Sequence, residues 1–454
     1  MSLHVVILAA GLGKRMQSLC PKVLHPIGGQ PMLERVVNTA LGLQPHTIHV
    51  VVGHGASHVQ DALPTLPVHW VFQEAQQGTG HAVLQTMPHI PKDSLVLILY
   101  ADVPLVRLDT LHSMVDHVRQ HADLVLLLAT VPNPSGLGRI IRNTQHRIES
   151  IVEEKDATPA QRAIHEIYSG ICCAPAALMQ RWLPQLDKNN AQGEYYLTDV
   201  IDMAVRDAIP IESFHVDDPM DIQGINDRLQ LHQVERTLQQ RIATQLMLSG
   251  VTLADASRID VRGTLTCGKD VFIDINAVFT GEVVLGDGCI IGPHCSLSHV
   301  TLGANCEIHA HSVLDHAHLG ADCHIGPFAR LRPGTQLATG CKIGNFVEAK
   351  NAVMDTNSKA SHLSYLGDVT IGKDVNIGAG TITCNYDGAN KHQTIIEEGV
   401  FIGSDTQLVA PVTIGKNATI GAGSTIRKDV PPDALTLTSS IQKTIVGWQR
   451  PRKK

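Results

Sequence analysis

The sequence contains few aromatic residues, few charges and no hydrophobic run long enough to span a membrane. Aromatic side chains make up 4% and charged side chains 17% of the 454 residues, while 43% are hydrophobic. This balance is typical of ordinary globular proteins and not of disordered chains. Aliphatic runs such as residues 95–99 are far shorter than the roughly 18 apolar residues of a membrane-spanning helix. Residues 1–10 lack the basic start of a secretory signal. We therefore expect a cytoplasmic protein with no membrane partner.

Paired cysteines and an excess of positive charge are missing as well. The ten cysteines are scattered, only Cys172 and Cys173 are adjacent, and no Cys-x-x-Cys pattern occurs. This spacing favours reduced thiols that act as small apolar side chains, in keeping with the cytoplasm. The net charge of −7 argues against a general nucleic-acid-binding protein, and the basic residues 450–454 are too few to reverse it. We expect no nucleic-acid partner.

The second half of the chain repeats an aliphatic residue followed by glycine at a step of six residues. Neither the 3.6-residue period of a helix nor the alternation of a strand produces this step. It is typical of a left-handed parallel β-helix of hexapeptide repeats, whose coils must stack because one coil cannot bury its own apolar face. We expect the aliphatic residue to point toward the axis and the glycine to allow a tight corner with positive φ. The repeat comprises Leu285-Gly286, Ile291-Gly292, Leu302-Gly303, Leu319-Gly320, Ile325-Gly326, Ile343-Gly344, Leu366-Gly367, Ile371-Gly372, Ile377-Gly378, Ile402-Gly403, Ile414-Gly415 and Ile420-Gly421.

The first half of the chain lacks this repeat and alternates strand-like with helix-like segments. Such alternation predicts an α/β domain with a doubly wound, mostly parallel, Rossmann-like sheet, which binds ligands at the carboxyl ends of its strands. Strands are expected at residues 4–10, 47–52, 69–72, 95–100 and 124–130, and helices at residues 32–41 and 81–87.

Apolar residues at steps of mostly four, from Leu229 to Leu246, predict a linker helix that Gly250 ends. A chain of this length suits two domains. We place them at residues 1–228 and 250–454, with the linker helix at residues 229–249.

A loop of small residues follows the first strand. Between residues 8 and 11, small side chains allow backbone N–H groups to approach a phosphate or a base, and Arg15 adds a fixed cation. The loop matches neither the dinucleotide fingerprint nor the Walker A loop, and alone it is equally consistent with a plain structural turn. At the end of the strand at residues 95–100, Asp102 is a hard-oxygen ligand suited to Mg²⁺, with a loop-capping role as the alternative.

Residues 8–16 together with residues 19–32 resemble the signature of nucleoside-diphosphate-sugar pyrophosphorylases. In that family the first loop wraps the nucleotide, and the lysine of a Pro-Lys pair, here Lys22, contacts phosphate. Gln73 and residues 77–82 resemble the segment with which uridylyltransferases of the family read uracil.

The resemblance also implies a metal site and a sugar site. Asp102 and Asn226 would ligate Mg²⁺, and Gly138 and Glu153 would hold the amino sugar. The implied site for UTP and UDP-N-acetylglucosamine comprises Leu8, Ala9, Ala10, Gly11, Arg15, Lys22, Gln73, Gly78, Thr79, Tyr100, Ala101, Asp102, Gly138, Glu153, Tyr168 and Asn226.

Two positions depart from the family pattern. Residues 166–170 read Glu-Ile-Tyr-Ser-Gly where the family has Glu-Ile-Asn-Ser/Thr-Gly, so Tyr168 replaces the amide expected at the sugar. Lys14 stands where the family commonly has threonine. Neither departure touches the expected metal ligands, and Tyr168 therefore bears on sugar affinity more than on the chemistry.

The six-residue repeat is interrupted at residues 345–350, 361–365 and 383–393, and residues 329–334 precede these breaks. Insertions in a solenoid gather on its binding face. These segments resemble the glucosamine-1-phosphate acetyltransferase half of the bacterial bifunctional enzymes that make UDP-N-acetylglucosamine.

This second resemblance implies that Arg332 and Lys350 bind the sugar phosphate and that His362 is the general base. The residue types suit these roles, because two cations match a phosphate dianion and an imidazole titrates near the working pH. A base is needed because a sugar ammonium must lose a proton before it attacks a thioester. The resemblance adds Tyr365 and Asn376 at the sugar, Ala379, Asn385, Tyr386, Ser404 and Ala422 at acetyl-CoA, and Ser439 where the family carries an arginine that contacts acetyl-CoA.

The two resemblances together imply one chain with two activities. It would transfer acetyl from acetyl-CoA to glucosamine-1-phosphate, and then UMP from UTP to N-acetylglucosamine-1-phosphate, releasing pyrophosphate with Mg²⁺ as cofactor. Because hexapeptide β-helices commonly form trimers with ligands between subunits, we expect a homotrimer. Two alternatives remain open: a monofunctional sugar-nucleotide pyrophosphorylase with a structural or regulatory β-helix, and a non-catalytic regulatory protein like those that pair these folds in nucleotide-exchange factors.

Histidines are frequent in the first coils of the expected β-helix. Their spacing matches no zinc pattern, and we expect them to be mostly exposed and structural. They are His309, His311, His316, His318 and His324, with Cys306 and Cys323 nearby.

Overall fold

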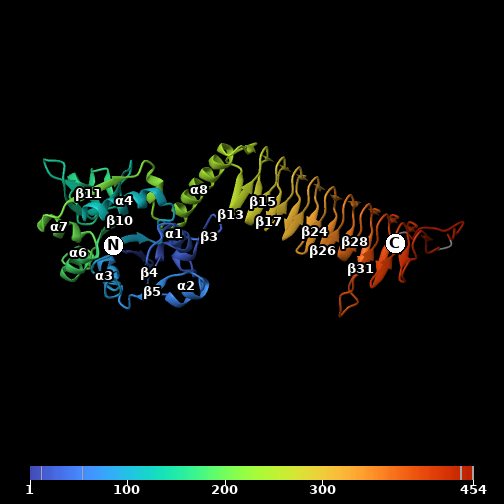
Figure 1. The fold of residues 1–454 in the computed structure, drawn as a ribbon, viewed down its shortest axis with the longest axis horizontal. Coiled ribbons are helices and arrows are strands. Elements are labelled where there is room, and N and C mark those ends of the chain that lie inside the picture. Colours follow the sequence, from blue (N-terminus) through green and yellow to red (C-terminus); the bar gives the residue numbers. More distant parts are fainter. Residues whose placement is uncertain (12, 54, 440–441, 452–454) are drawn as a thin grey trace. The chain divides into compact units, whose positions relative to one another are not determined.

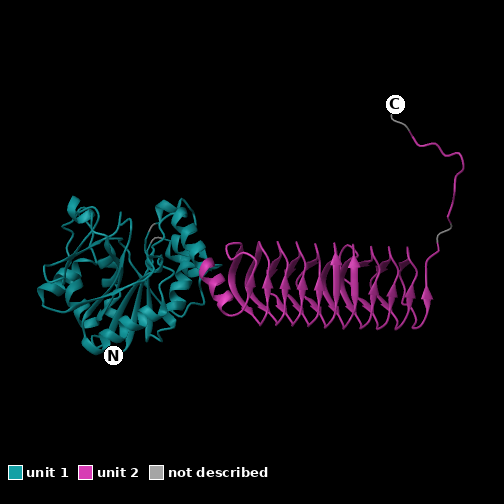
Figure 2. Ribbon diagram, turned by 90° about the horizontal axis from the view of Figure 1, so that it is seen from above, with its two compact units in different colours: residues 1–238 teal, residues 239–454 magenta. Residues whose placement is uncertain are grey.

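The computed structural model describes residues 1–11, 13–53, 55–439 and 442–451. Leu12 of the small-residue loop and residues 452–454 of the basic end lie outside the described residues. The chain forms two compact units, Met1–Leu238 and Gln239–Lys454 (Figures 1 and 2). Within the described part of the chain, no helix has both the length and the apolar character needed to cross a membrane.

Unit 1 is built on a nine-stranded sheet whose main path runs β11-β7-β10-β6-β1-β4-β5. β1 pairs in parallel with β4 and β6, and β7 pairs in parallel with β11, whereas β10 runs antiparallel between β6 and β7. The predicted mostly parallel sheet is confirmed, with β9 and β10 as exceptions that the sequence did not indicate. The strands are β1 (Leu3–Leu8), β4 (Thr47–Val52), β5 (His69–Phe72), β6 (Leu95–Tyr100), β7 (Leu124–Thr130), β8 (Arg139–Arg142), β9 (Ile148–Val152), β10 (Glu166–Pro175) and β11 (Ile211–His215), and β2 (Pro26–Ile27) pairs separately with β3 (Gln30–Pro31).

Helices cover both faces of this sheet because its central strands are apolar on both sides. In β1, Val5 and Ile7 pack with helices α1 and α4, while Val6 and Leu8 pack on the other face with α3, α6 and α7. Successive side chains of a strand point to opposite faces, so a continuously apolar strand is buried on both faces of the sheet. The helices are α1 (Met32–Leu41), α2 (Ala56–Ala62), α3 (Thr79–Leu84), α4 (Leu108–His121), α5 (Pro159–Arg162), α6 (Ala176–Trp182), α7 (Asp199–Arg206) and α8 (Arg228–Leu248).

Unit 2 is a parallel β-helix with its coils stacked along one axis (Figure 2). The aliphatic residues of the repeat form in-register ladders inside it, as Ile291, Ile308, Ile325 and Ile343 show, each at most 1% exposed. The inward direction predicted for these residues is confirmed. One sheet contains β12 (Thr252–Leu253), β14 (Phe272–Ile273), β16 (Ile290–Ile291), β19 (Glu307–Ile308), β22 (His324–Ile325), β25 (Lys342–Asn345), β27 (Lys359–His362), β29 (Asn376–Ile377), β32 (Phe401–Ile402), β35 (Thr419–Ile420) and β37 (Leu435–Thr436).

A second, 15-stranded sheet completes the coils. It contains β13 (Ile259–Cys267), β15 (Ala277–Leu285), β17 (Ser296–Ser298), β18 (Thr301–Leu302), β20 (Val313–Asp315), β21 (Ala317–Leu319), β23 (Arg330–Leu331), β24 (Thr335–Leu337), β26 (Glu348–Met354), β28 (Tyr365–Ile371), β30 (Ile382–Cys384), β31 (Thr394–Ile396), β33 (Gln407–Val409), β34 (Val412–Ile414) and β36 (Thr425–Ile426).

The glycines of the repeat do not serve the purpose that the sequence predicted. Among the aliphatic–glycine pairs only Gly326 takes a positive φ. Most of the others are required by close packing of coils: a Cβ on Gly286 would lie 2.6 Å from the backbone of Gly303 in the next coil, whereas one on Gly367 would meet the Tyr365 side chain of its own strand. Positive φ occurs instead at an Asn/Asp corner, where Asn305 (57°) donates from Nδ2 to Oδ1 of Asp322 (58°) at 3.2 Å. The prediction of positive φ at the repeat glycines was therefore wrong.

The helix α8 begins and ends within one residue of the linker helix expected at residues 229–249. The boundary between the two compact units falls inside it, after Leu238. Of its apolar residues, Val234 and Leu246 are buried, whereas Leu229 is exposed.

Candidate active sites

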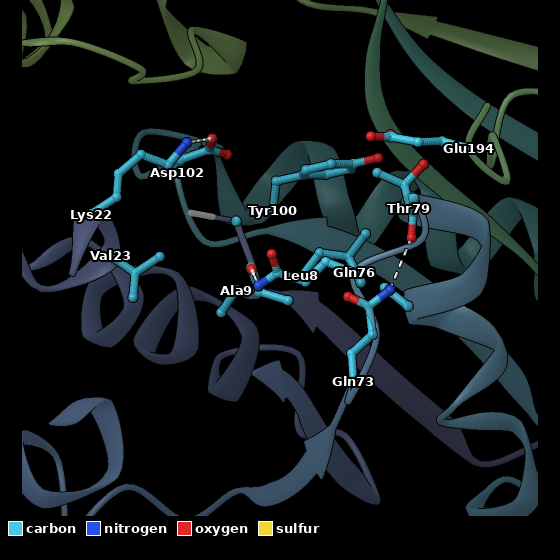
Figure 3. Close-up of a pocket in the computed structure, with 14 residues that line it drawn as sticks. Leu8, Ala9, Lys22, Val23, Gln73, Gln76, Thr79, Tyr100, Asp102 and Glu194 are labelled. Carbon is cyan, nitrogen blue, oxygen red and sulfur yellow. Dashed lines mark hydrogen bonds and ion pairs between the residues drawn. The ribbon is translucent and has the colours of Figure 1, made fainter. Parts of the chain in front are cut away.

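A cavity of about 380 Å³ lies at the carboxyl ends of β1 and β6 in unit 1 (Figure 3). Parallel strands end at the same edge of a sheet, so the loops that follow them converge there. Ala101 lies buried at this edge and joins the two loops by donating its backbone N–H to the Leu8 carbonyl at 3.1 Å. Of the residues predicted to bind nucleotide, the cavity brings together Leu8, Ala9, Ala10, Gly11, Lys22, Gln73, Gly78, Thr79, Tyr100 and Asp102.

One cation already lies between the two expected magnesium ligands. Lys22 Nζ is 2.5 Å from Asp102 Oδ2 and 3.2 Å from Asn226 Oδ1. The Ile225 backbone N–H donates to the Asp102 carbonyl at 2.9 Å and holds the Asn226 loop beside Asp102. A carboxylate and an amide oxygen that converge on one positive charge are the hard donors that Mg²⁺ prefers. The residues present therefore fit a magnesium ion.

The predicted uracil-reading residues meet where β5 ends and α3 begins. Gln73 is 4% exposed, and its Nε2 donates to the Gly78 carbonyl at 3.1 Å and lies 3.0 Å from His81 Nδ1. Gly78 has a φ of 110° and faces the Tyr195 backbone, 2.5 Å from where a Cβ would stand. Only glycine fits this position. The Gln73 amide is thus fixed at the cavity wall.

The residues predicted to hold the sugar form a second cluster beside Tyr100. A Cβ on Gly138 would lie 3.6 Å from Glu153 Oε1, so these two are neighbours. Burial raises the pKa of Glu153, whose Oε1 accepts from the Thr198 hydroxyl at 3.4 Å. Tyr168 is 6% exposed, and its hydroxyl donates to the Gly170 carbonyl at 2.8 Å.

Some residues at this site differ from the sequence expectation. Arg15 lies in the short 3₁₀ helix Lys14–Met16 with its side chain exposed, and it does not line the cavity. Conversely, Gln76 and Glu194 line the cavity without having been predicted. Gln76 Nε2 donates to the Ala10 carbonyl at 2.7 Å, which ties the small-residue loop to the opposite wall. This contact joins loops that no local motif connects.

In unit 2, a column of predicted residues runs along one corner of the β-helix. Asn345 pairs with His362 in the register of β25 and β27. The Gly380 N–H donates to the His362 carbonyl, the Asp405 N–H to the Ala379 carbonyl and the Gly423 N–H to the Ser404 carbonyl, at 3.3, 2.7 and 2.8 Å. The corner therefore presents, coil after coil, His362, Ala379, Ser404 and Ala422.

The environment of His362 suits a base. Its side chain is exposed, and Nδ1 lies 3.0 Å from Asn345 Oδ1. An amide oxygen can only accept, so Nδ1 carries the hydrogen and Nε2 is left with a free lone pair. Asn345 was not predicted as a site residue, since its partner lies one coil away.

A cluster of basic side chains lies at the next corner of the coils, beside Asn351 and Asp368, which both take positive φ. Lys391 contacts Lys350, and this contact, with a further contribution from Arg332, lowers the pKa of Lys350. Arg332 is held by Glu348, whose Oε1 accepts from Nη1 at 2.7 Å. Like charges placed together in this way create a strong local attraction for a polyanion. Lys391 was missed from the sequence because it reaches Lys350 only through the fold of the loop.

The inserted loop between β30 and β31 is ordered by its own polar contacts. Asn385 Nδ2 donates to Asp368 Oδ2 at 2.5 Å, and Asp387 Oδ2 lies 2.7 Å from His392 Nε2. Tyr386 is exposed, and its backbone forms an isolated antiparallel β-bridge with that of Lys391. Burial opposes ionisation of Asp368, but hydrogen bonds from Asn351 and Asn385 lower its pKa overall. The Asn385 contact fixes the loop to the coils at Asp368.

The remaining three predicted residues lie on different elements. Tyr365 begins β28 and pairs with Glu348, the carboxylate that holds Arg332, whereas Asn376 begins β29 in the other sheet. Ser439 is exposed and follows Thr438, whose Oγ1 accepts from the Thr425 N–H at 3.0 Å beyond the last coil.

The fold and the two sites define a nucleotidyltransferase domain joined to a hexapeptide-repeat transferase domain. Residues 5–199 match the family described as MobA-like NTP transferase domain, and residues 265–299 and 393–428 match the bacterial transferase hexapeptide family. The chain is 64% identical to the bifunctional protein GlmU of Legionella pneumophila (strain Lens), covering 100% of this chain and 99% of that protein. It is 52% identical to the bifunctional protein GlmU of Marinobacter nauticus, covering 99% of both. The chain belongs to the GlmU family.

Family membership confirms the function predicted from the sequence. The chain is a bifunctional enzyme of UDP-N-acetylglucosamine biosynthesis, with uridylyltransferase and glucosamine-1-phosphate N-acetyltransferase activities. Neither the monofunctional nor the regulatory alternative is retained.

Proposed function

We propose that uridylyl transfer takes place in the cavity of unit 1, where Lys22, Asp102 and Asn226 surround the reacting phosphates. The observation that carries this assignment is the Lys22 ammonium between Asp102 and Asn226. The phosphate oxygen of N-acetylglucosamine-1-phosphate attacks the α-phosphorus of UTP, the new O–P bond forms, and the bond to pyrophosphate breaks. The attacking oxygen is already ionised, so no strong general base is needed.

The protein groups stabilise charge and orient the substrates during this step. A magnesium ion on Asp102 and Asn226 would supply positive charge to the phosphate oxygens when bound. Lys22, released from those two oxygens, turns to the phosphates and offsets the charge that develops on the leaving group. Arg15, exposed on the adjacent 3₁₀ helix, closes over the triphosphate when the small-residue loop wraps it.

The base and the sugar bind at opposite ends of this cavity. Gln73, with its amide fixed by Gly78, reads the uracil edge together with Thr79. Gly138 and Glu153 hold the amino sugar, and Tyr168 supports this end by fixing the Gly170 backbone.

We further propose that acetyl transfer takes place at the corner of unit 2 that His362 occupies. Nε2 of His362 takes a proton from the sugar ammonium, and the amine nitrogen attacks the thioester carbonyl of acetyl-CoA. The C–N bond forms and the C–S bond breaks as the coenzyme A thiolate leaves. The attacking nitrogen gives up a second proton, which the thiolate takes, and His362 returns the first proton to solvent. Nδ1, bonded to Asn345, keeps the ring oriented throughout.

The substrates of this reaction bind on either side of the base. The basic cluster of Arg332, Lys350 and Lys391 holds the phosphate of glucosamine-1-phosphate. Tyr365 and Asn376 contact the sugar. The coenzyme extends along the column of Ala379, Ser404 and Ala422 and is bounded by Asn385, Tyr386 and, beyond the last coil, Ser439.

Several features of the assembled enzyme are part of the same proposal. The column lies open on an outward corner, which supports a homotrimer in which a neighbouring subunit covers the coenzyme. The domains extend over residues 1–228 and 250–454, joined by a helix at residues 229–249, and the enzyme acts in the cytoplasm. Light scattering at micromolar concentration should give three times the mass of the chain, and a monomer would remove the inter-subunit site.

Two assays on the purified chain test whether magnesium is needed at the site of unit 1 and not at that of unit 2. Pyrophosphate release from UTP and N-acetylglucosamine-1-phosphate should stop when EDTA removes divalent ions and return with Mg²⁺. Release of the coenzyme A thiol from acetyl-CoA and glucosamine-1-phosphate should be unaffected by either step. Pyrophosphate release that survives EDTA would refute the roles of Asp102 and Asn226.

A further inference from the structure

Three side chains that the two reactions do not use converge on the surface of unit 2. Glu307 and His324 face each other in the register of β19 and β22, on neighbouring coils. His309 follows Glu307 by two positions and turns toward it. One ligand atom from each of the three lies within 4.8 Å of the other two. The sequence predicted only a structural role for His309 and His324, because Glu307 and His324 become neighbours only through the register of the coils.

The separations are those of a coordination sphere and not of direct hydrogen bonds. Glu307 Oε2 lies 3.4 Å from His324 Nδ1 and 3.8 Å from His309 Nε2. An N–H···O hydrogen bond spans about 2.7–3.2 Å. Zinc ligands lie about 2.0–2.2 Å from the ion, which separates two tetrahedral ligands by about 3.4 Å. One pair already has this separation, and the others need only small rotations of side chains that are 39–46% exposed.

We propose that Glu307, His309 and His324 bind one divalent cation of the zinc class and so staple two adjacent coils of the β-helix. Two imidazoles and one carboxylate are borderline-to-hard donors that suit Zn²⁺, Co²⁺ and Ni²⁺ better than Mg²⁺. Water completes the sphere, because the site is open to solvent. The ladder continues with Ile290 on one side and Lys342 on the other, and Lys342 is exposed and free to turn outward.

The site is distinct from the one that would hold magnesium, so binding can be measured without activity. The tag-free full chain is stripped with EDTA, desalted and titrated with Zn²⁺ by calorimetry and with Co²⁺ by visible absorption, in excess Mg²⁺. The variants are Glu307→Gln, His309→Ala and His324→Ala. His318→Ala is the matched control, because His318 is also an exposed histidine on a coil but belongs to the other sheet.

The wild type and His318→Ala should each bind one more equivalent of the titrated metal ion than any of the three cluster variants does. If a cluster variant still binds that equivalent, its affinity should be at least about tenfold lower. Zn²⁺ should also raise the melting temperature of the wild type and of the control but not of the cluster variants, since a ligand that binds only the folded state stabilises it. The proposal is overturned if the cluster variants bind as the wild type does, or if the wild type shows no saturable site below about 100 μM. Zn²⁺ binding that leaves the melting temperature unchanged would overturn the proposal that the ion staples two coils.

Discussion

Lys22 Nζ lies 2.5 Å from Asp102 Oδ2, just after the end of strand β6, and this contact joins the lysine expected to bind phosphate to an expected metal ligand. Asn226 Oδ1 completes the contact at 3.2 Å. The ammonium thus occupies the space between two oxygens that a magnesium ion would use. In the proposed site, lysine and metal would therefore compete for the same ligands until nucleotide arrives and gives the lysine a phosphate to bind.

Removing this lysine should have opposite effects on metal binding and on catalysis. In Lys22→Ala, Mn²⁺, used as a probe for Mg²⁺, should bind more tightly than in the wild type when no nucleotide is present. The rate of uridylyl transfer should nevertheless fall about 100-fold or more, because a cation at the phosphates is lost. Electron paramagnetic resonance of free Mn²⁺ and a pyrophosphate assay measure the two effects. Lys14→Ala, at an exposed neighbouring position, should change neither. Weaker Mn²⁺ binding in Lys22→Ala would refute the competition.

Asn345 is predicted to act through His362. Its Oδ1 is 3.0 Å from Nδ1 and selects the tautomer with Nε2 unprotonated. In Asn345→Ala, the acetyl-transfer rate should fall about 10-fold while the KM for acetyl-CoA stays close to that of the wild type. Asn345→Asp should restore part of the rate, because a carboxylate oxygen also accepts from Nδ1. A rate loss that Asn345→Asp does not restore, with a raised KM for acetyl-CoA, would indicate a structural role only.

Tyr168, which replaces the amide found in the family, is predicted to support the sugar site without contacting the sugar through its hydroxyl. The hydroxyl is already committed to the Gly170 carbonyl at 2.8 Å. Tyr168→Phe should therefore cost about 1 kcal/mol of unfolding free energy. The KM for N-acetylglucosamine-1-phosphate should change less than about 3-fold. Chemical denaturation and steady-state kinetics test this, and a large rise in KM with unchanged stability would show a direct sugar contact instead.

A chain of histidines is predicted to make unit 1 sensitive to acid. His49 Nε2 lies 3.2 Å from His4 Nδ1, and His49 Nδ1 lies 3.2 Å from His69 Nδ1. The His46 ring lies tilted against His4, and the His89 ring stacks with His49 and meets His69 edge-on. Burial, followed by repulsion from His4, His69 and His89, lowers the pKa of His49 from 6.5 to about 4.

Because the folded pKa lies below the unfolded one, stability is complete above about pH 6.5 and is lost as the pH falls toward 4. Between pH 7.5 and 5.5, His49 should remove about 1 kcal/mol from the unfolding free energy of unit 1. The fluorescence of Trp182, which is fully buried in unit 1, follows this transition. The pH dependence should shrink by that amount in His49→Gln and persist in His58→Gln, an exposed histidine of α2. An equal slope in His49→Gln would exclude His49 as its source.

The sequence was most informative where one short period or one motif decides the structure. The six-residue repeat was sufficient to predict inward ladders such as Ile308 and Ile325, because burial of an apolar side chain is a local demand repeated on every coil. It was misleading about the glycines, whose need arises from the backbone of the next coil and not from their own φ. Most of the residues that the motifs predicted to bind nucleotide likewise line one cavity.

Contacts that depend on strand register or on the path of a loop could not be predicted from a short period or a motif. Asn345, Lys391 and Glu307 each meet their partners only after the coils are stacked or the inserted loop is folded. The antiparallel course of β10 is similar, since its apolar sequence fits either direction in a buried sheet. In each instance the missing information is a long-range pairing.

The most direct test of two independent sites in one chain is a pair of variants, each measured in both assays. Asp102→Asn should lose pyrophosphate release by about 100-fold or more and keep acetyl transfer. His362→Ala should lose acetyl transfer by about 100-fold or more and keep pyrophosphate release. Acetyl transfer at the wild-type rate in His362→Ala, or the loss of both activities in either folded variant, would contradict this account.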